Sequence, residues 1–263
     1  MYKIAISDLD GTLLGPDHRI SVKTEETIQR WVQSGRKFVI ATGRHYIEAK
    51  HLQESLNIPI YLITSNGARI HNKEGKIIHQ QNLPSNIAQE ICDTVFSDAV
   101  QINLFTDQNW YANYPLAELD GMGLDAGFNC IKADLSKLDK SNTIKIFFYA
   151  EAELLQPVYD LLAARYGDKI NLTFSLTKCL EVMCANTNKG EAVKVVLKRK
   201  SLEISDAIAF GDGMNDLEML LAVAKPIVMA NAQYALKEAL PNVEKTLSSK
   251  EHGVAVIMER YLT

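Results

Sequence analysis

The sequence of 263 residues contains no apolar run that approaches the roughly 18 residues of a membrane-spanning helix. The apolar run near Met1 reaches Asp8 at once, and it is too short for the apolar region of a secretory signal. We therefore expect a cytoplasmic protein that has no membrane partner.

The sequence also has few cysteines, and none of them form a C-x-x-C pair. The four are Cys92, Cys130, Cys179 and Cys184. Scattered cysteines are typical of a reduced, cytoplasmic protein, and they make a disulfide framework or a thiolate metal site a weak interpretation.

Basic residues do not gather in long runs, and 28 of them against 32 acidic residues give a net charge of −4. A short cluster, Lys198 to Lys200, is typical of a solvated helix end rather than of a nucleic-acid patch. We therefore expect no nucleic-acid partner. The sequence has no internal repeat, and its 47% hydrophobic and 23% charged residues are typical of a globular protein.

Short apolar segments alternate with helical patterns at both ends of the chain. This alternation predicts a Rossmann-like α/β core, with a parallel sheet and helices on both of its faces. Ser21 is placed to cap a helix that stops near Gly35. Strands are expected at 3–7, 37–41, 61–64, 207–210 and 226–229, helices at 21–34, 46–56, from 189 and at 216–222, and a hairpin at 68–79.

The middle of the chain is richer in aromatic and β-branched residues, which predicts a second sheet with helices of its own. Expected strands are 101–106, 109–113, 143–149, 171–174 and 180–183, with a helix at 151–165. We therefore predict a core domain formed by residues 1–82 and 187–263, with an α/β domain of residues 83–186 inserted into it. A single large sheet is the alternative.

The first of four short motifs is D-L-D-G-T-L, Asp8 to Leu13, directly after an expected strand. A bare D-x-D pair is common by chance, and the alternative interpretation is a turn in which Asp caps a helix. Gly11 suits a tight turn, however, and ligand sites in open parallel sheets lie at the carboxyl ends of strands. Two carboxylates there can divide the work, because one stays ionised while the other acts as acid and base.

The second motif, A-T-G-R at Ala41 to Arg44, also follows an expected strand. The Thr42 hydroxyl can bind an anion, and Gly43 lets backbone N–H groups approach that anion closely. An ordinary strand-to-helix turn is the alternative. The sequence leaves open whether Arg44 is an anion ligand or a surface charge.

The third motif, N-K-G at Asn188 to Gly190, opens an expected helix. A lysine is most often solvated, but an ammonium group at the start of a helix makes a good phosphate site. Lys189 is therefore a candidate phosphate ligand.

The fourth motif, G-D-G-M-N-D at Gly211 to Asp216, follows the expected strand at 207–210. Asp212 and Asp216 offer oxygen ligands to a hard cation such as Mg²⁺. A dinucleotide site is a poor alternative, because Asp216 stands where the pattern G-x-G-x-x-G has its third glycine. Together the four motifs supply a nucleophile, an acid/base, a hydroxyl, an ammonium and metal-binding carboxylates, which is the set that phosphoryl transfer requires.

These motifs resemble those of the haloacid dehalogenase superfamily, in its Cof-type branch of phosphatases with a large inserted α/β cap. The resemblance covers essentially the whole chain. Within that branch, the chain looks most like the bacterial pyridoxal phosphate phosphatases. The stretches that carry the likeness are S-D-L-D-G-T-L-L, A-T-G-R-H, I-T-S-N-G-A-R, C-L-E-V-M and I-A-F-G-D-G-M-N-D.

The resemblance implies a role for each matching residue. Asp8 would be the nucleophile and a Mg²⁺ ligand, and Asp212 would be a further metal ligand. Asp10 would be the general acid/base and would bind Mg²⁺ through its backbone carbonyl. Asp216 would support the metal site and orient Lys189. The phosphate would be bound by the backbone of Leu9 and by Thr42, Gly43, Lys189 and Asn215.

The activity that this resemblance implies is Mg²⁺-dependent hydrolysis of small phosphomonoesters through an aspartyl-phosphate. Pyridoxal 5′-phosphate is the favoured substrate, and a sugar-phosphate phosphatase of broad specificity is the alternative. A phosphomutase and a non-catalytic sensor of phosphorylated ligands rank lower. The expected partner is therefore a small phosphorylated metabolite, and the sequence does not reveal the oligomeric state.

The cap is expected to close over the site and to select the substrate. Its aromatic residues are candidates for stacking on a pyridine ring, with a place in the cap core or on its surface as the alternative. Glu181, near the return to the core, is a further candidate for substrate contact. The aromatic candidates are Trp110, Tyr111, Tyr114 and Phe128.

Overall fold

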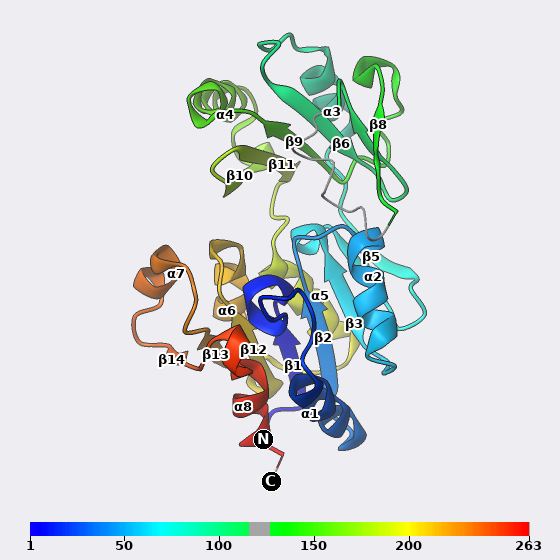
Figure 1. Cartoon of the computed structure of the whole chain (residues 1–263). Helices are drawn as coiled ribbons and strands as arrows, with labels where there is room; N and C mark the ends of the chain where they lie inside the picture. Colours follow the sequence, from blue (N-terminus) through cyan, green and yellow to red (C-terminus); the bar gives the residue numbers. More distant parts are fainter. Residues whose placement is uncertain (116–126, 263) are drawn as a thin grey trace. The chain divides into compact units, whose positions relative to one another are not determined.

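The computed structural model describes residues 1–115 and 127–262, which fall into two compact units (Figure 1). Unit 1 consists of Met1–Arg44, Ala49–His79 and Asn188–Thr263, and unit 2 consists of His45–Glu48 and Gln80–Thr187. Both ends of the chain therefore belong to one unit. Unit 2 also includes His45–Glu48, a segment that the division expected from the sequence leaves in the core.

Unit 1 is built on an eight-stranded sheet in the order β14-β13-β12-β1-β2-β3-β4-β5. Neighbouring strands from β14 to β3 run parallel, whereas β3 and β4 are antiparallel. All of β1 is buried, as expected for a central strand with both faces covered. The strands are β1 Ile4–Ser7, β2 Lys37–Ala41, β3 Tyr61–Thr64, β4 Arg69–His71, β5 Ile77–Gln80, β12 Ala207–Gly211, β13 Lys225–Val228 and β14 Glu244–Lys245.

Helices of unit 1 pack in pairs. Helix α1 (Val22–Gln33) contacts α8 (Gly253–Glu259), whereas α5 (Lys189–Arg199) contacts α6 (Leu217–Leu221). The buried Trp31 anchors α1, and Ser21 Oγ caps this helix by accepting a hydrogen bond from Thr24 N at 3.2 Å. Unit 1 also contains α7 (Tyr234–Ala239) and most of α2 (Tyr46–Ser55).

The chain leaves the sheet in turns at the carboxyl ends of three adjacent strands, β12, β1 and β2. In the parallel register, Ser7 pairs with Phe210 on one side and with Ile40 on the other. The motifs that follow these strands therefore emerge side by side at one edge of the sheet. After Asp8, the chain forms a kinked helical turn at Leu9–Leu13, in which Gly11 adopts a positive φ of 77°.

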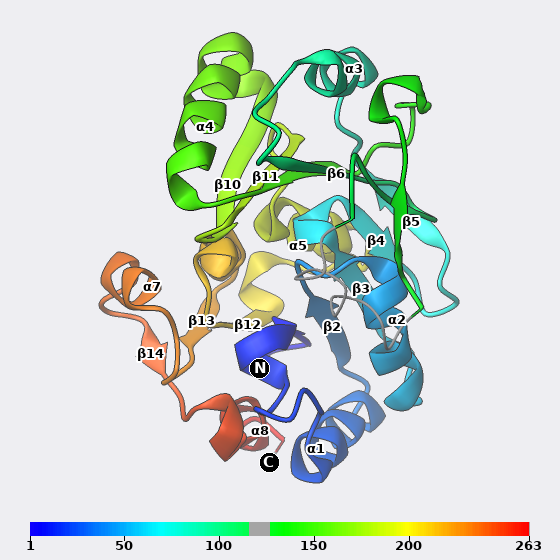
Figure 2. The same ribbon diagram turned by 45° about the horizontal axis from the view of Figure 1, so that its top comes forward.

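Unit 2 contains a six-stranded sheet in the order β10-β11-β9-β6-β7-β8. Its strands are antiparallel except for β7 and β8, which run parallel. Helices α3 (Ser85–Asp93) and α4 (Ala152–Tyr166) pack against this sheet and share one hydrophobic core with it (Figure 2). The strands are β6 Gln101–Phe105, β7 Trp110–Ala112, β8 Cys130–Lys132, β9 Lys145–Tyr149, β10 Ile170–Leu176 and β11 Cys179–Cys184.

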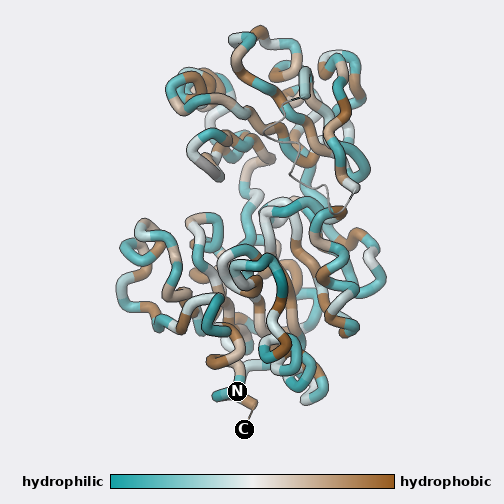
Figure 3. Tube along the Cα trace, in the orientation of Figure 1, coloured by the Kyte–Doolittle hydropathy of each residue, from teal (hydrophilic) through white to brown (hydrophobic). Residues whose placement is uncertain are grey.

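The predicted fold class, a parallel α/β core with a further α/β region, is confirmed, and the alternative of one large sheet is wrong. Hydrophobic stretches coincide with the central strands of each sheet, which is why the sequence reveals these strands (Figure 3). Strand β8 is short and largely exposed, so it has no such signal. The four cysteines are free thiols. No helix in the described part of the chain combines the length and apolar character needed to cross a membrane.

Gly190, near the start of α5, lies against the backbone of α6. A Cβ atom at this position would overlap the carbonyl group of Glu218. We expect Gly190→Ala to lower the free energy of unfolding by about 1–3 kcal/mol, because one of the two helices must shift. Urea unfolding measures this change. The exposed Lys194→Ala on the same helix is the control and should change the free energy by less than about 0.5 kcal/mol, and equal effects would contradict the close packing.

Candidate active site

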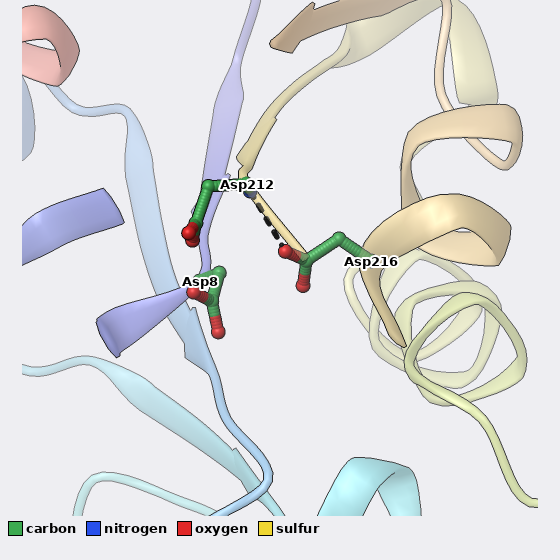
Figure 4. Close-up of side chains that lie close together, drawn as sticks. All are labelled: Asp8, Asp212 and Asp216. Carbon is green, nitrogen blue, oxygen red and sulfur yellow. Dashed lines mark hydrogen bonds between the residues drawn. The ribbon is translucent and has the colours of Figure 1, made fainter. Parts of the chain in front are cut away.

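Three acidic side chains from two loops converge in unit 1. Asp8 follows β1, whereas Asp212 and Asp216 follow β12. Carboxylate oxygens of all three lie within 4.8 Å of one another, which is close enough to share a metal ion (Figure 4). Asp8 and Asp216 are buried, and Asp212 is half-buried. The structure thus brings together carboxylates from the first and the fourth motif.

Lys189 places its ammonium group between two of these carboxylates. It is fully buried, and its Nζ donates to Asp8 Oδ1 and to Asp216 Oδ1, each at 2.6 Å. Burial opposes the charge, but Asp216 and Asp8 more than offset this effect and raise the pKa of Lys189, so the amine stays protonated. Asn188 Oδ1 caps α5 by accepting a hydrogen bond from Glu191 N at 2.9 Å. Lys189 is therefore a fixed positive charge beside Asp8.

Asp216 is fully engaged by other groups of unit 1. Its Oδ1 accepts from Lys189, and its Oδ2 accepts from the backbone N–H groups of Asp212 and Gly213, both at 2.9 Å. A carboxylate that already has three donors suits a supporting role better than direct coordination of a metal. Asp216 fixes the loop that carries Asp212 and orients Lys189.

Asp212 lies against the turn that follows β1. Thr12 Oγ1 donates to Asp212 Oδ1 at 2.7 Å, and this hydrogen bond joins the two loops. Gly11 passes so close to the Asp212 carboxylate that a Cβ atom at this position would overlap it. Asn231 Nδ2 donates to the Gly11 carbonyl at 2.7 Å and holds the same turn. The position of Asp212 therefore depends on the first motif as well as on its own.

The cluster carries more negative than positive charge. The cluster has three carboxylates and one ammonium group, which leaves two negative charges uncompensated when all are ionised. Burial, together with the charges of Asp216 and Asp212, raises the pKa of Asp8 well above its usual value, although Lys189 opposes this shift. Burial also raises the pKa of Asp212. A divalent cation would compensate the excess charge, and carboxylate oxygens are ligands that Mg²⁺ accepts, so the residues fit this ion.

The side chain of Asp10 points to a different partner. Arg44 Nε and Nη2 lie 2.8 and 2.5 Å from its two carboxylate oxygens, in a two-pronged ion pair. This pair answers the question that the sequence leaves open about Arg44, because Arg44 binds the candidate acid/base. A role for Asp10 in metal binding would have to use its backbone carbonyl.

The predicted phosphate-binding residues lie around the same edge of the sheet. Thr42 is buried after β2, where its Oγ1 accepts a hydrogen bond from Arg44 N at 3.1 Å. Gly43 lies against the side chain of Asn66, whose Oδ1 accepts from Asn215 Nδ2 at 3.1 Å. Leu9 is buried at the start of the turn that follows Asp8. Their binding of phosphate stays a prediction.

Asn66 is a site residue that the motif analysis does not assign. It follows β3, and it links the second motif to the fourth through Gly43 and Asn215. Ser65 and Asn66 have positive φ values of 48° and 52°, which fits the turn-forming sequence Asn-Gly. That dipeptide is the signal by which the turn can be found. The contact between its side chain and Asn215 has no local signal.

An acidic cluster with a buried lysine at the carboxyl edge of a parallel sheet is an arrangement that suits a hydrolase acting on phosphate esters. The haloacid dehalogenase-like hydrolases match residues 5–258 of the chain. The chain belongs to this family, and it is a phosphatase of the Cof-type branch, a phosphoric monoester hydrolase.

Relatives and solved structures agree with this assignment. An HMP-PP phosphatase of Escherichia coli K12 is 34% identical over 262 residues, which cover 100% of this chain and 96% of the relative. A Buchnera aphidicola protein named only as a phosphatase is 36% identical over 262 residues, covering 99% and 98%. A haloacid dehalogenase-like hydrolase from Bacteroides thetaiotaomicron matches with a TM-score of 0.87 and 26% identity, over 99% of this chain and 100% of that one.

Removal of the Lys189 ammonium would leave Asp8 and Asp216 buried without their shared partner. We expect Lys189→Met to lower the free energy of unfolding by about 3–5 kcal/mol at neutral pH, because stranded buried charges are costly. Urea unfolding without added metal measures the loss. The double variant Lys189→Met/Asp216→Asn strands one charge fewer and should recover part of it. If the double variant recovers nothing, the electrostatic explanation is wrong.

Proposed function

We propose that this phosphatase depends on Mg²⁺ and hydrolyses small phosphomonoesters through an aspartyl-phosphate formed on Asp8. The observation that supports this most is the position of Asp8, which lies buried between the Lys189 ammonium and the Asp212 carboxylate. Mg²⁺ would be held by Asp8, Asp212 and the backbone carbonyl of Asp10, and it would offset negative charge on the transferring phosphoryl group.

In the first step, a carboxylate oxygen of Asp8 attacks phosphorus while the bond to the leaving oxygen breaks. Lys189 and the amide of Asn215 offset charge on the phosphoryl oxygens. Asp10 donates a proton to the leaving oxygen, which belongs to an alcohol when the substrate is a phosphomonoester. Because Arg44 occupies both oxygens of Asp10 in the structure, Asp10 must leave this ion pair before it can carry that proton.

In the second step, water attacks the phosphorus of the aspartyl-phosphate. Asp10, now a carboxylate, takes a proton from this water, and the bond between phosphorus and the Asp8 oxygen breaks. Inorganic phosphate leaves, and both aspartates return to their starting states.

Two observations suggest different substrates for the site. The sequence motifs resemble those of pyridoxal phosphate phosphatases, whereas the E. coli relative is named as an HMP-PP phosphatase. We propose pyridoxal 5′-phosphate as the candidate phosphomonoester and HMP-PP, a diphosphate, as a second candidate, with sugar phosphates as the broader alternative. A phosphomutase or a non-catalytic sensor ranks lower. In each case the partner is a small phosphorylated metabolite, and we expect it to be met in the cytoplasm.

A phosphate-release assay with and without Mg²⁺ tests this function. The substrates are pyridoxal 5′-phosphate, HMP-PP and a set of sugar phosphates. We expect inorganic phosphate to appear only with Mg²⁺, and no phosphate to be transferred to a second acceptor. The absence of release from every ester, or transfer of the phosphate to a second sugar, would overturn the proposal.

Asp8→Asn should abolish turnover, by at least about 1,000-fold, because an amide cannot form the aspartyl-phosphate. The substitution keeps the shape of the side chain, so the fold should survive, and circular dichroism checks this. Acid-quenched protein should carry phosphate in the wild type and none in the variant. Turnover at the wild-type rate in folded Asp8→Asn protein would rule out the covalent route.

Asp10→Asn should mainly slow the second step, the hydrolysis of the aspartyl-phosphate. Loss of a general acid/base slows a reaction by about 10²–10⁴-fold. An activated leaving group such as p-nitrophenol needs little protonation, so Asp8 should still be phosphorylated. Hydrolysis of the aspartyl-phosphate should then stall, and a quenched-flow experiment should find that it accumulates. An unchanged steady-state rate would remove Asp10 from its assigned role.

A further inference from the structure

The turn after β3 begins at Ser65 and lies against the second motif. The N–H group of Ser65 donates to the carbonyl of Arg44 at 2.9 Å. The next N–H group, that of Asn66, donates to the carbonyl of Thr42 at 3.1 Å. The Asn66 side chain also packs on Gly43, because a Cβ atom on that glycine would lie only 3.1 Å from Asn66 Oδ1. The turn therefore supports the backbone that we expect to bind phosphate.

The same turn contacts the third motif. Gly67 has a φ of 103°, and a Cβ atom at this position would overlap the carbonyl of Asn188, which caps α5. Between these contacts Asn66 is less than a tenth exposed, with a left-handed backbone at φ 52° and ψ 31°. Asparagine adopts this conformation more readily than most residues. The side chain of Asn66 is therefore held in one place from both of its neighbours.

The Asn66 side chain reaches the fourth motif. Its Oδ1 accepts a hydrogen bond from Asn215 Nδ2 at 3.1 Å. Asn215 is exposed, and among the described residues no other group forms a hydrogen bond with its side chain. A side chain without such a contact would lose its fixed rotamer, and it would have to be ordered again each time that a ligand binds. The orientation of the Asn215 amide therefore depends on Asn66.

This hydrogen bond also decides which end of the Asn215 amide is turned toward the second motif. An amide has an oxygen that accepts and an NH₂ group that donates twice. Asn66 Oδ1 only accepts, so it favours the orientation that brings Asn215 Nδ2 toward it. Asn215 Oδ1 then lies toward Gly213, where an added Cβ atom would be 2.5 Å from it. One hydrogen of Nδ2 remains for a further acceptor.

Phosphate oxygens are acceptors, so the amide end that faces them has to be the NH₂ group. With the amide reversed, Asn215 would present its own oxygen and repel the anion. The Asn66 side chain brings Nδ2 of Asn215 beside Gly43, whose backbone N–H is a predicted phosphate ligand. A buried asparagine thus sets the polarity of an exposed one.

We propose that Asn66 is a positioning residue for the phosphoryl group, because it holds the Asn215 amide with an N–H directed at a phosphoryl oxygen. The inference rests on the proposed function, which gives Asn215 a phosphate-binding role, and it adds the residue on which that role depends. Asn66 acts through Asn215 and takes no part in bond making or breaking.

The first test removes each amide singly and measures hydrolysis of p-nitrophenyl phosphate with Mg²⁺. Asn215→Ala should lower kcat/KM by about 100-fold, as expected for the loss of one donor to developing negative charge. Asn66→Gly keeps the left-handed backbone, because glycine adopts it without strain. It should lower kcat/KM by about tenfold, since Asn215 is still present but no longer held in the productive geometry.

The double variant Asn66→Gly/Asn215→Ala decides whether Asn66 acts through Asn215. Its kcat/KM should equal that of Asn215→Ala within about twofold, because no amide is left to position. Independent effects would instead multiply to about 1,000-fold. A multiplied loss overturns the inference, and so does a folded Asn66→Gly protein with the wild-type kcat/KM.

Calorimetric titration with inorganic phosphate and Mg²⁺ measures binding without turnover. The Kd for phosphate should rise in Asn66→Gly and in Asn215→Ala, and the double variant should bind no more weakly than Asn215→Ala. A merely structural role would lower the melting temperature and leave the Kd of the folded protein unchanged. That result would contradict the inference, and circular dichroism confirms that each variant is folded.

A matched control and a second variant complete the design. Asn57 is exposed and also has a positive φ, 49°, but it precedes β3, whereas Asn66 follows that strand. Asn57→Gly should therefore keep the wild-type kcat/KM and Kd. If Asn66→Gly does not fold, Asn66→Ser replaces it, because its side chain is too short for the contact and Ser65 already adopts a φ of 48° in this turn. The expected losses are the same.

The outcomes separate this inference from the proposed function. If Asn215→Ala loses activity and the Asn66 variants do not, the phosphatase function stands and the role of Asn66 is wrong. If the wild type hydrolyses no ester, the proposed function fails, and the phosphate titration still tests the inference. A wild type that binds no phosphate, or an Asn215→Ala variant that binds it with unchanged Kd, overturns the inference.

Discussion

The buried ammonium of Lys189 is the interaction on which the rest of the active site depends. It lies between Asp8 and Asp216, so it connects the loop after β1, the loop after β12 and the start of α5. Each connection needs close backbone contact. Gly67 lies against the Asn188 carbonyl, and Gly190 lies against Glu218, so neither position has room for a side chain. These two glycines therefore allow the close backbone contacts that position the Lys189 ammonium, and they are not needed to make the loops flexible.

The parallel register explains why these loops meet at all. Ser7 and Phe210 are paired neighbours, so the residues that follow them leave adjacent strands at the same level. Carboxylates placed there repel one another, and burial adds to the cost, as the raised pKa of Asp8 indicates. Lys189 compensates only part of the charge. The remaining negative charge favours a cation at this edge of the sheet. That cation would in turn offset the charge of a transferring phosphoryl group.

Local features of the site could be predicted from the sequence, whereas contacts between distant loops could not. Asp8 after a buried strand, Asn188 at a helix start and Asp212 after the strand ending at Gly211 each have a signal within a few residues. The ion pair of Arg44 with Asp10 and the hydrogen bond of Asn215 to Asn66 join separate loops. Their geometry depends on how those loops approach one another, and no spacing in the sequence encodes that approach. The same holds for His45–Glu48, which follows a core motif but belongs to unit 2.

The sequence alone does not show which aromatic residues of unit 2 join the cluster of rings around Phe105. The alternation of side chains along a strand explains which of them do. Trp110 joins the ring cluster around Phe105, whereas its neighbour Tyr111 packs against the hydrophobic core shared with the helices. The two buried lysines can then be compared. Lys189 pairs with Asp216, whose oxygens are all engaged, and this satisfied network fixes a geometry. Lys145 pairs with Glu181, whose second oxygen has no hydrogen-bond partner among the described residues, so this network fixes its members less completely.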